Sequence, residues 1–342
     1  MKVTVVIPNY NGMKFIKTCL DSLRNQSYKD FETLVVDNAS EDGSYEYMKE
    51  HYPEVKLVRL DKNYGFSAAV NKGIDLSETP YVILLNNDTE ADENFVLELV
   101  NGIEKSDDIF SCSSRMISFH DRNVLDDAGD LYSLVGWGFQ RGVGQKVSAY
   151  KKDDEVFSAC AGAAIYRKKV FDEIGKFDLK HFAYLEDLDV GYRAKIHGYK
   201  NMYCAKAIVY HVGSGTSGSK YNSFKVKLAA RNNIYLIYKN MPFLQLAINM
   251  PFLAVGFFVK YLFFKKIGFA NDYKKGFIEG MQTMHRLKKV EYDDKNRSHY
   301  IQIEKELIKN TFIYVKDYLE RNCISYQKDT FGADTKIYVR KR

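Results

Sequence analysis

Two short polar stretches carry the side chains of this sequence that are best suited to chemistry. Asn86-Asn87-Asp88 directly follows the uninterrupted apolar run Tyr81–Leu85, and Glu186-Asp187 opens a segment with helical spacing. A carboxylate beside short amides can hold a hard divalent cation, which in turn binds phosphate oxygens. A carboxylate aimed into a crevice can act as a general base. The two stretches therefore point to metal-assisted chemistry on a phosphate-bearing substrate.

Each of these residues also has a purely structural interpretation. Asn and Asp are common turn formers, so the residues after Leu85 could be a simple turn. Glu186 and Asp187 would complement the dipole of a helix that begins with them. His211 follows the apolar run 207–210, and a single His is more often a core or surface residue than a ligand. The elements around these residues decide between the two interpretations.

Strand and helix patterns alternate four times within the first hundred residues. Strands are expected at 3–7, 31–36, 55–60 and 81–85, and helices at 13–26, from Ser40 onward, at 67–74 and at 90–104. The run Tyr81–Leu85 shows no polar alternation, which is typical of a strand covered on both faces. This order predicts an α/β fold with right-handed βαβ units and a mostly parallel central sheet flanked by helices.

Polar residues follow each of the four predicted strands. They are Asn9 to Asn11, Asp37 with Asn38, Asn63, and Asn86 to Asp88. Ligands of open α/β sheets bind beyond the carboxyl ends of the strands, so this recurrence favours a binding role for Asp88 over a simple turn. No G-x-G-x-x-G follows the first strand and no G-x-x-x-x-G-K-[ST] occurs. A nucleotide would therefore have to be held by side chains and a metal rather than by a glycine-rich loop.

The middle of the chain is less regular. Residues 107–155 contain five glycines and read as a loop-rich insert that lines or covers a site. Strand character returns at 156–167, around small residues that allow close backbone approach. A short helix over 170–174 ends at Gly175, and the Gly/Ser-rich segment 213–219 is predicted to be a mobile loop that closes over substrate. The five cysteines are scattered, which favours reduced thiols.

Charge divides the chain into two unlike parts. Residues 213–342 contain 24 Lys and Arg against 11 Asp and Glu, a net charge of +13, whereas residues 1–212 have a net charge of −7. A basic half indicates an anionic partner, and because no nucleic-acid recognition motif accompanies the charge, a membrane surface is favoured over nucleic acid. Met1-Lys2 leads straight into the first strand, so no secretory leader is expected.

The C-terminal hundred residues predict a helical extension that associates with a membrane. Residues 243–264 are apolar and just long enough to span a bilayer, but Pro251, Gln245, Asn249 and Lys260 argue against a simple spanning helix. Lysines without nearby acids suit a helix pair that lies in the interface of an anionic leaflet. A buried helical hairpin is the alternative. Amphipathic helices are expected at 276–287 and 300–319, where self-association as a homodimer is one use of their apolar faces.

Taken in order, the motifs resemble those of family 2 glycosyltransferases with the GT-A fold. The resemblance covers residue 3 to about residue 240, and its closest subgroup is the bacterial rhamnosyltransferase-like enzymes of surface polysaccharide assembly. It predicts a catalytic domain over 1–240 and the extension over 241–342. The motifs are Val-Val-Ile-Pro-Asn-Tyr-Asn (5–11), Val-Val-Asp-Asn-Ala-Ser (35–40), Asn-Tyr-Gly-Phe-Ser-Ala-Ala-Val-Asn (63–71), Leu-Leu-Asn-Asn-Asp-Thr (84–89), Gly-Ala (162–163), Gly-Lys-Phe-Asp (175–178), Tyr-Leu-Glu-Asp-Leu-Asp (184–189), and His211 with Gly213 and Ser214.

The resemblance implies a role for each candidate residue. The residues that would frame the nucleobase and ribose or line the nucleotide pocket are Pro8, Asn9, Tyr10, Asn11, Asp37, Asn63, Gly65 and Asn71. Asn86, Asn87 and Asp88 occupy the place of the family's D-x-D motif, with Asn in place of the first Asp. His211 matches a position that completes the metal site in some relatives, so Asp88 and His211 would hold Mg²⁺ or Mn²⁺. Asp187 would be the catalytic base, with Glu186 as the second candidate.

The implied activity is inverting transfer of a sugar from a nucleotide-diphosphate donor, with dTDP-L-rhamnose as one candidate donor. The acceptor would be a glycan or a polyprenyl-diphosphate-linked glycan at the cytoplasmic face of the cell membrane. A sugar nucleotidyltransferase and a non-catalytic nucleotide-sugar-binding protein are the alternatives. The first would want a basic loop after the first strand, where this chain has Asn9-Tyr-Asn-Gly12. A polymerising synthase is disfavoured, since the sequence contains no Q-x-x-R-W motif.

Overall fold

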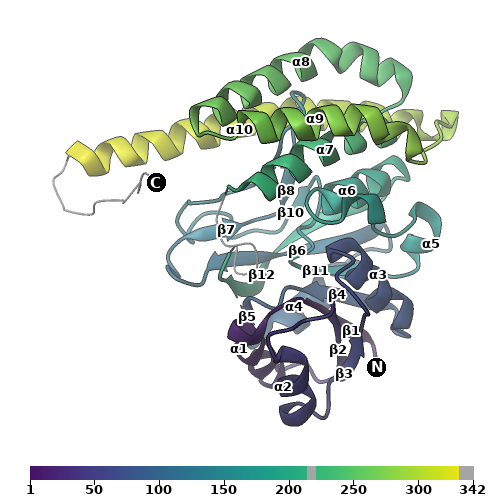
Figure 1. Cartoon of the computed structure of the whole chain (residues 1–342), viewed down its shortest axis with the longest axis vertical. Coiled ribbons are helices and arrows are strands. Elements are labelled where there is room, and N and C mark those ends of the chain that lie inside the picture. The colour runs from purple at the N-terminus through teal and green to yellow at the C-terminus, as the bar shows by residue number, and fades with distance from the viewer. Residues whose placement is uncertain (214–220, 331–342) are drawn as a thin grey trace.

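The computed structural model describes residues 1–213 and 221–330, with side chains described up to residue 320. Its centre is a ten-stranded mixed sheet in the order β10-β12-β6-β11-β4-β1-β2-β3, with β5 beside β12 and β7 beside β6 (Figure 1). β8 and β9 form a separate two-stranded sheet. The strands are β1 Val3–Asn9, β2 Phe31–Asp37, β3 Lys56–Arg59, β4 Tyr81–Leu85, β5 Thr89–Ala91, β6 Ile109–Ser118, β7 Leu125–Asp127, β8 Asp130–Tyr132, β9 Gly138–Gln140, β10 Asp154–Val156, β11 Ala163–Arg167 and β12 Lys200–His211.

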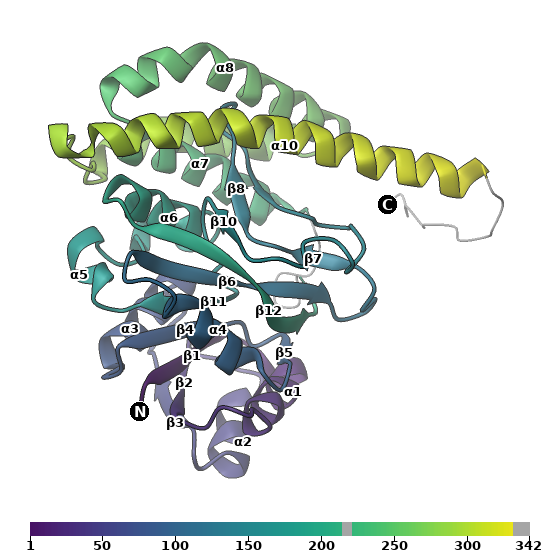
Figure 2. The same cartoon turned by 180° about the vertical axis from the view of Figure 1, so that it is seen from behind.

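Helices cover both faces of this sheet and build an additional layer beyond it (Figures 1 and 2). The short 3₁₀ turns are Leu179–His181, Met284–Arg286 and Asp294–Asn296. The α-helices are α1 Met13–Arg24, α2 Ser44–His51, α3 Phe66–Leu76, α4 Phe95–Ile103, α5 Val170–Ile174, α6 Glu186–Ile196, α7 Ser223–Asn240, α8 Phe243–Lys266, α9 Ala270–Thr283 and α10 Arg297–Thr330.

The four N-terminal strands confirm the predicted parallel sheet. β4, β1, β2 and β3 are neighbours in that order and all run parallel. All five residues of β4 are buried, as its unbroken apolar run predicts. Asn9 at the end of β1 lies opposite Asp37 at the end of β2, so the polar residues that follow these strands meet at one edge of the sheet.

The second half of the sheet differs from the prediction. The insert expected to be loop-rich contains β6, a ten-residue strand that lies between β12 and β11 in the middle of the sheet. Its polar residues hide it from a hydrophobicity pattern, yet Ser111, Ser113 and Ser114 are buried, and the hydroxyl of Ser111 donates to Asn201 at 2.8 Å. β11 and β10 run antiparallel to their neighbours, so the sheet is mixed.

Two predicted helices begin later than expected. The helix expected from Ser40 begins at Ser44, because Ser40 instead bonds the end of β2 through Asp37. The helix expected over 90–104 is preceded by the short strand β5, which pairs with β12, and α4 begins only at Phe95. The expected loop 213–219 lies outside the described residues except for Gly213.

The C-terminal helices form successive layers over α6. α6 packs on α7, α7 packs on α9, and α9 packs on α8, while α10 runs past α6 and β8. Figures 1 and 2 show α8 on the side of this stack that is farthest from the sheet. The helical extension is therefore present as expected, although the predicted helix at 276–287 lies at Ala270–Thr283, and the one at 300–319 is part of the longer α10.

Candidate active site

The ends of β1, β2 and β4 are joined by a buried network of side chains. Asn9 donates to Asp37 at 2.8 Å, and Asn87 donates to the side-chain oxygen of Asn9 at 2.8 Å. Ser40 donates to the same Asp37 oxygen at 2.6 Å. Asn9, Asp37 and Asn87 are almost fully buried, so these three predicted binding residues hold the strand ends together as the floor of the site. Tyr10 remains exposed at its rim.

The loop of residues 63–65 is tied to the end of β2. Asn38 donates to the carbonyl of Gly65 at 3.0 Å, and the side chain of Asn63 accepts from the Gly65 N–H at 2.9 Å. Gly65 has φ of +87°, and a Cβ there would lie 2.6 Å from Phe182, so only glycine fits this position. Pro8, partly buried, and the exposed Asn11 flank the same edge. Asn38 was expected at this edge as a polar residue after the second strand, but no binding role was assigned to it.

The side chain of Asn71 hydrogen-bonds to the backbone of Phe177. Its side-chain nitrogen donates to the carbonyl of Phe177 at 2.7 Å, and its side-chain oxygen accepts from the Phe177 N–H at 3.1 Å. This pair of bonds fastens α3 to the turn after Gly175. The observed bonds of Asn71 are therefore structural, whereas the family resemblance implies that this residue lines the nucleotide pocket.

Asp88 and His211 lie side by side, as the predicted metal site requires. β5 pairs with the end of β12, and this pairing sets Nε2 of His211 3.3 Å from a carboxylate oxygen of Asp88. The other ring nitrogen, Nδ1, lies 2.6 Å from the carboxylate of Asp126. Burial lowers the pKa of His211, but its hydrogen bonds to Asp126 and Asp88 outweigh burial and raise the pKa to about 10. Asp126 lies in the insert and was not predicted.

The loop of residues 160–162 connects the Asp88 stretch to α6. The backbone N–H of Asn86 donates to the carbonyl of Gly162 at 2.8 Å. The neighbouring Ala161 N–H donates to Asp187 at 3.5 Å. A Cβ at Gly162 would lie 3.0 Å from the side-chain nitrogen of Asn86, so a small residue permits this approach. The two acidic stretches, about a hundred residues apart in sequence, therefore flank one three-residue loop.

The first turn of α6 gives its three carboxylates different surroundings. Asp187 is partly exposed, and it accepts from the Leu188 N–H at 2.8 Å. Glu186 is buried, and one of its carboxylate oxygens finds no partner among the described residues. Burial raises the pKa of both Asp187 and Glu186. Of the two, Asp187 is the carboxylate that an acceptor can reach.

Asp189 has a structural role. It is fully buried and bonds Arg193, Lys239 and Asn240 at 2.8–3.1 Å. Although burial opposes ionisation, Lys239 and Arg193 lower the pKa of Asp189. This ion-pair network holds α6 against α7. Asp189 therefore differs in role from Glu186 and Asp187, which take no part in the network.

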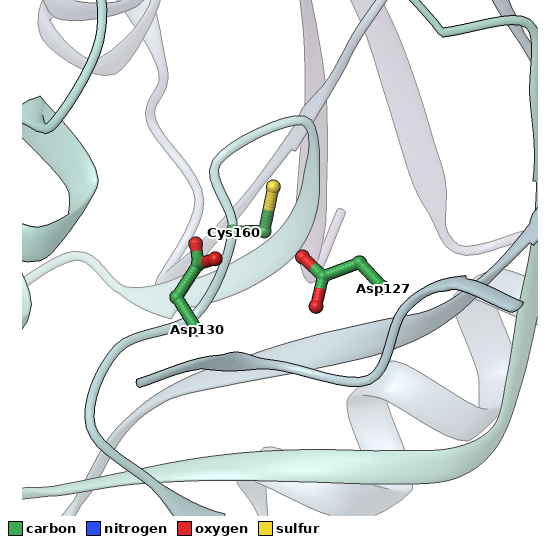
Figure 3. Close-up of side chains that lie close together, drawn as sticks. All are labelled: Asp127, Asp130 and Cys160. Atoms are coloured by element: carbon green, nitrogen blue, oxygen red, sulfur yellow. The ribbon is translucent and has the colours of Figure 1, made fainter. Parts of the chain in front are cut away.

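Residues 126–130 contribute three carboxylates to the site that were not predicted. Figure 3 shows Asp127 and Asp130 facing Cys160, and the donor atoms of these three residues all lie within 4.8 Å of one another. Asp127 accepts from the Gly129 N–H at 2.6 Å, and burial raises its pKa to about 7. Burial and the neighbouring Asp127 also raise the pKa of Asp130. The available signal was Asp126-Asp-Ala-Gly-Asp130, three acids in five residues, within a segment whose glycines indicated a loop.

Comparison with known proteins places this geometry among sugar transferases. The family model described as Glycosyl transferase family 2 matches residues 4–175. The amylovoran biosynthesis glycosyltransferase AmsB of Erwinia amylovora is 28% identical over 306 residues, which are 82% of this chain and 96% of AmsB. The N-acetylglucosaminyl-diphospho-decaprenol L-rhamnosyltransferase of Mycobacterium tuberculosis is 24% identical over 237 residues, which are 63% of this chain and 77% of that protein.

A solved structure shares the fold. The mannosyltransferase PcManGT of Pyrobaculum calidifontis, solved in complex with GDP-Man and Mn²⁺, has a TM-score of 0.53 at 14% sequence identity. The matched region covers 96% of this chain and 87% of PcManGT. At this level of identity the likeness concerns the fold alone.

Proposed function

Because the chain belongs to glycosyl transferase family 2, we propose that it is an inverting transferase. It moves a sugar from a nucleotide-diphosphate donor to a glycan or lipid-linked glycan acceptor in bacterial surface polysaccharide synthesis. The observation that carries this proposal is the loop of residues 160–162, which contacts the Asp88 stretch through Asn86 and the carboxylate of Asp187. A donor diphosphate and an attacking hydroxyl need these two kinds of group on neighbouring sides of one cleft.

In this proposal Asp187 accepts the proton of the acceptor hydroxyl as its oxygen attacks the anomeric carbon. The new C–O bond forms on the face opposite the departing nucleoside diphosphate, so a single displacement inverts the anomeric centre. No covalent intermediate with the enzyme is needed. The partial exposure of Asp187 and the backbone N–H groups that orient its carboxylate support this role over Glu186, which is buried.

Asp88 and His211 fit a divalent cation, which would take the place of the proton that the two carboxylates hold on His211 in the metal-free protein. Asp126 occupies Nδ1 of His211, an arrangement that directs Nε2 toward Asp88, as carboxylate–histidine pairs do at metal sites. A bound Mg²⁺ or Mn²⁺ supplies positive charge that stabilises the departing diphosphate. Asn86 and Asn87 do not add charge, so we expect Asp88, His211 and the donor's own phosphate oxygens to form most of the coordination shell.

The donor is proposed to be dTDP-L-rhamnose. Support comes from the rhamnosyltransferase-like motifs and from the similarity to the mycobacterial L-rhamnosyltransferase. A thermal-shift screen of nucleotide sugars with Mn²⁺ tests this choice, because a donor that binds at concentration c stabilises the folded state by RT ln(1 + c/Kd) and so raises the melting temperature.

The decisive test of the activity is Asp187→Asn. Positioned base catalysis is typically worth about 10² to 10⁴ in rate, so kcat should fall by that factor while donor binding stays close to wild type. Glu186→Gln is the matched comparison, since it makes the same change at the adjacent buried carboxylate and should cost less. Near-wild-type turnover by folded Asp187→Asn would remove the assigned role.

We also propose that the extension attaches the enzyme to the cytoplasmic face of the membrane as a monotopic protein. α8 is the one helix in the described residues that is long and apolar enough to cross a membrane. Its buried residues are Gln245, Asn249, Leu253 and Gly256, which form a stripe at helical spacing. Its large apolar side chains face outward, with Phe243 84% and Phe258 61% exposed.

This inverted pattern favours an interface over a buried hairpin. Gln245 and Asn249 both donate to Glu304 of α10 at 2.9 Å, so the polar residues that argued against a spanning helix serve the inner face. A helix with its polar side on the protein and its apolar side outward suits the boundary of a lipid leaflet. Such attachment would bring the site to a polyprenyl-diphosphate-linked acceptor.

A further inference from the structure

The turn of residues 126–130 is connected to α6 at three levels. Asp130 and Ser158 exchange backbone hydrogen bonds of 3.0 and 3.1 Å. The hydroxyl of Ser158 donates to the backbone carbonyl of Asp187 at 2.6 Å. The carboxyl group of Asp130 also lies close enough to that of Asp187 for a side-chain hydrogen bond, which acts to raise the pKa of Asp130 and to lower that of Asp187. A Cβ at Gly191 would lie 2.4 Å from the Ser158 hydroxyl, so α6 sits tightly against this connection.

A hydrogen bond between two carboxyl groups requires a proton. Two ionised carboxylates only accept, so one member of the pair must be a neutral acid. Asp187 already accepts from the backbone N–H groups of Leu188 and Ala161, and such bonds favour the ionised form. Asp130 is buried, so its neutral form is the less costly one. The proton therefore belongs on Asp130.

The charged groups around Asp130 also favour its neutral form. The titratable side chains that face it are Asp127 from β7, Glu186 and Asp187 from α6, Cys160 from the loop before β11, and Tyr166 from β11. None of them is positively charged. Burial and the carboxyl groups of Asp127, Asp187 and Glu186 raise the pKa of Asp130, so they disfavour a negative charge there.

We propose that Asp130 is a positioning residue for the base: as a neutral acid it donates a hydrogen bond to the Asp187 carboxylate and holds it oriented toward the acceptor hydroxyl. The inference rests on the proposed role of Asp187. When Asp187 takes the acceptor's proton, both carboxyl groups are neutral, and Asp187 returns that proton to solvent before the next turnover.

A cation between Asp127, Asp130 and Cys160 is the competing interpretation of the same cluster. Two contacts oppose it. One oxygen of Asp127 is taken by the Gly129 N–H at 2.6 Å, and Asp130 is bonded to Asp187. Burial also raises the pKa of the Cys160 thiol well above its usual value, so the sulfur is a weak metal ligand. Although the second oxygen of Asp127 finds no partner among the described residues, the cluster is better described as a set of buried acids with raised pKa values.

The test compares Asp130→Asn with Asp130→Ala in the full chain. Asn keeps a donor toward Asp187 and Ala removes it. With the nucleotide sugar selected by the thermal-shift screen, Asp130→Ala should lower kcat at least about tenfold, with KM for the donor unchanged, a part of the roughly 10² to 10⁴ that a positioned base supplies. Without its donor, Asp187 should ionise at higher pH, so the acid limb of the pH–kcat profile should move upward. Asp130→Asn should restore most of kcat.

A second measurement needs no substrate. Infrared difference spectra at neutral pH should show that Asp130→Asn removes the carbonyl stretch of one neutral carboxylic acid. Asp121→Asn makes the same change at an exposed carboxylate of the same insert, and it should leave that band in place. Circular dichroism and a melting curve confirm that each variant is folded.

Each remaining outcome is decisive. An unchanged infrared band, or wild-type kcat and pH profile in Asp130→Ala, would overturn the proposal. Equal loss in Asp130→Asn and Asp130→Ala would show that the hydrogen-bond donor is irrelevant, and weakened Mn²⁺ binding in Asp130→Asn would favour the cation site instead. Full activity of Asp187→Asn would reject the proposed role of Asp187 as the base while leaving the transferase activity in place, and the infrared result would still report on the shared proton.

Discussion

His211 is held from both sides of its ring by carboxylates that lie far apart in sequence. Asp126 bonds Nδ1 at 2.6 Å, and Asp88 lies 3.3 Å from Nε2. The structure thus supplies a negative group that the Asn86-Asn87-Asp88 stretch lacks. At the proposed metal site Asp126 would act on the histidine rather than on the cation, which is how the partners of metal-bound histidines usually act.

We predict that Asp126→Ala weakens metal binding. Loss of such an orienting carboxylate typically costs about 10- to 100-fold in metal affinity, because the imidazole is no longer held in one tautomer and orientation. Calorimetric titration of Mn²⁺ in the presence of the nucleoside diphosphate measures the change. Asp121→Ala, at an exposed acid of the same insert, is the control, and an unaltered Mn²⁺ affinity in Asp126→Ala would argue against the assigned metal site.

The burial of His181 leads us to predict that the free energy of unfolding falls in acid. It is fully buried, and burial lowers its pKa to about 4, against about 6.5 in an unfolded chain. The unfolded state therefore binds the proton first, so stability declines as the pH falls from about 6.5 toward about 4. The expected contribution between pH 7 and pH 5 is about 2 kcal/mol of unfolding free energy.

The variant His181→Phe isolates this contribution. Neither ring nitrogen of His181 finds a hydrogen-bond partner among the described residues, and the ring lies edge-on to Tyr235 at 6.0 Å, a contact that Phe preserves. Urea unfolding at pH 7 and pH 5 should show a smaller acid loss in the variant. Identical pH dependence in both proteins would mean that another group controls the acid sensitivity.

At the scale of the elements, α9 packs closely against α7 at two glycines. Gly276 and Gly280 lie one turn apart, and both face α7. A Cβ at Gly276 would lie 2.1 Å from the carbonyl oxygen of Lys227, and one at Gly280 would lie 2.8 Å from Cβ of Ile234. The close approach of these helix backbones leaves no room for a side chain between them.

We therefore predict that Gly276→Ala destabilises the protein despite the higher helix propensity of alanine. Propensity alone favours Ala by about 1 kcal/mol. Overpacking against a backbone atom typically costs about 1 to 3 kcal/mol, and here it should outweigh propensity. Urea unfolding measures the sum, with Lys275→Ala at the adjacent exposed position as the control. A more stable Gly276→Ala protein would show that α9 can move away from α7 without cost.

The elements also differ in how far they could be predicted. β4 is identifiable because all five of its residues are apolar, and its polar end marks the site edge. β6 could not be recognised, because its polar serines are buried, and the partner of Ser111 is Asn201, some ninety residues away. Asp126, Asp127 and Asp130 were visible as a cluster of acids. Their roles depend on His211, Cys160 and Asp187, which no local pattern connects to them.

At the scale of the whole molecule, the proposed base and the outer apolar surface belong to one stack of helices. α6 carries Asp187, and the buried bonds of Asp189 to Lys239 and Asn240 fasten it to α7. α7 contacts α9, and α9 contacts α8. The surface proposed to dock on a membrane through α8 is thereby fixed in orientation relative to the proposed base.

The last prediction concerns that surface. Lys265 and Lys266 end α8 beside its exposed apolar face, within a segment that has no acid from residue 190 to 271. A basic residue near an anionic leaflet is worth about 1 kcal/mol, so Lys265→Glu should weaken binding to vesicles that contain phosphatidylglycerol at least about fivefold. Sedimentation with vesicles measures this. Lys49→Glu makes the same charge change on α2, at the end of the molecule opposite α8 (Figure 1), and should bind as wild type does.

A substitution in the apolar face distinguishes insertion of apolar side chains into the membrane from electrostatic attraction to anionic lipids. Phe258→Ser removes a side chain that is 61% exposed, so it should leave folding intact and reduce binding to neutral as well as anionic vesicles. Lys265→Glu should affect only the anionic ones, and added salt should weaken that part alone. If neither change alters vesicle binding, the exposed face of α8 is not the surface that docks on a membrane. The acceptor would then have to reach Asp187 from solution.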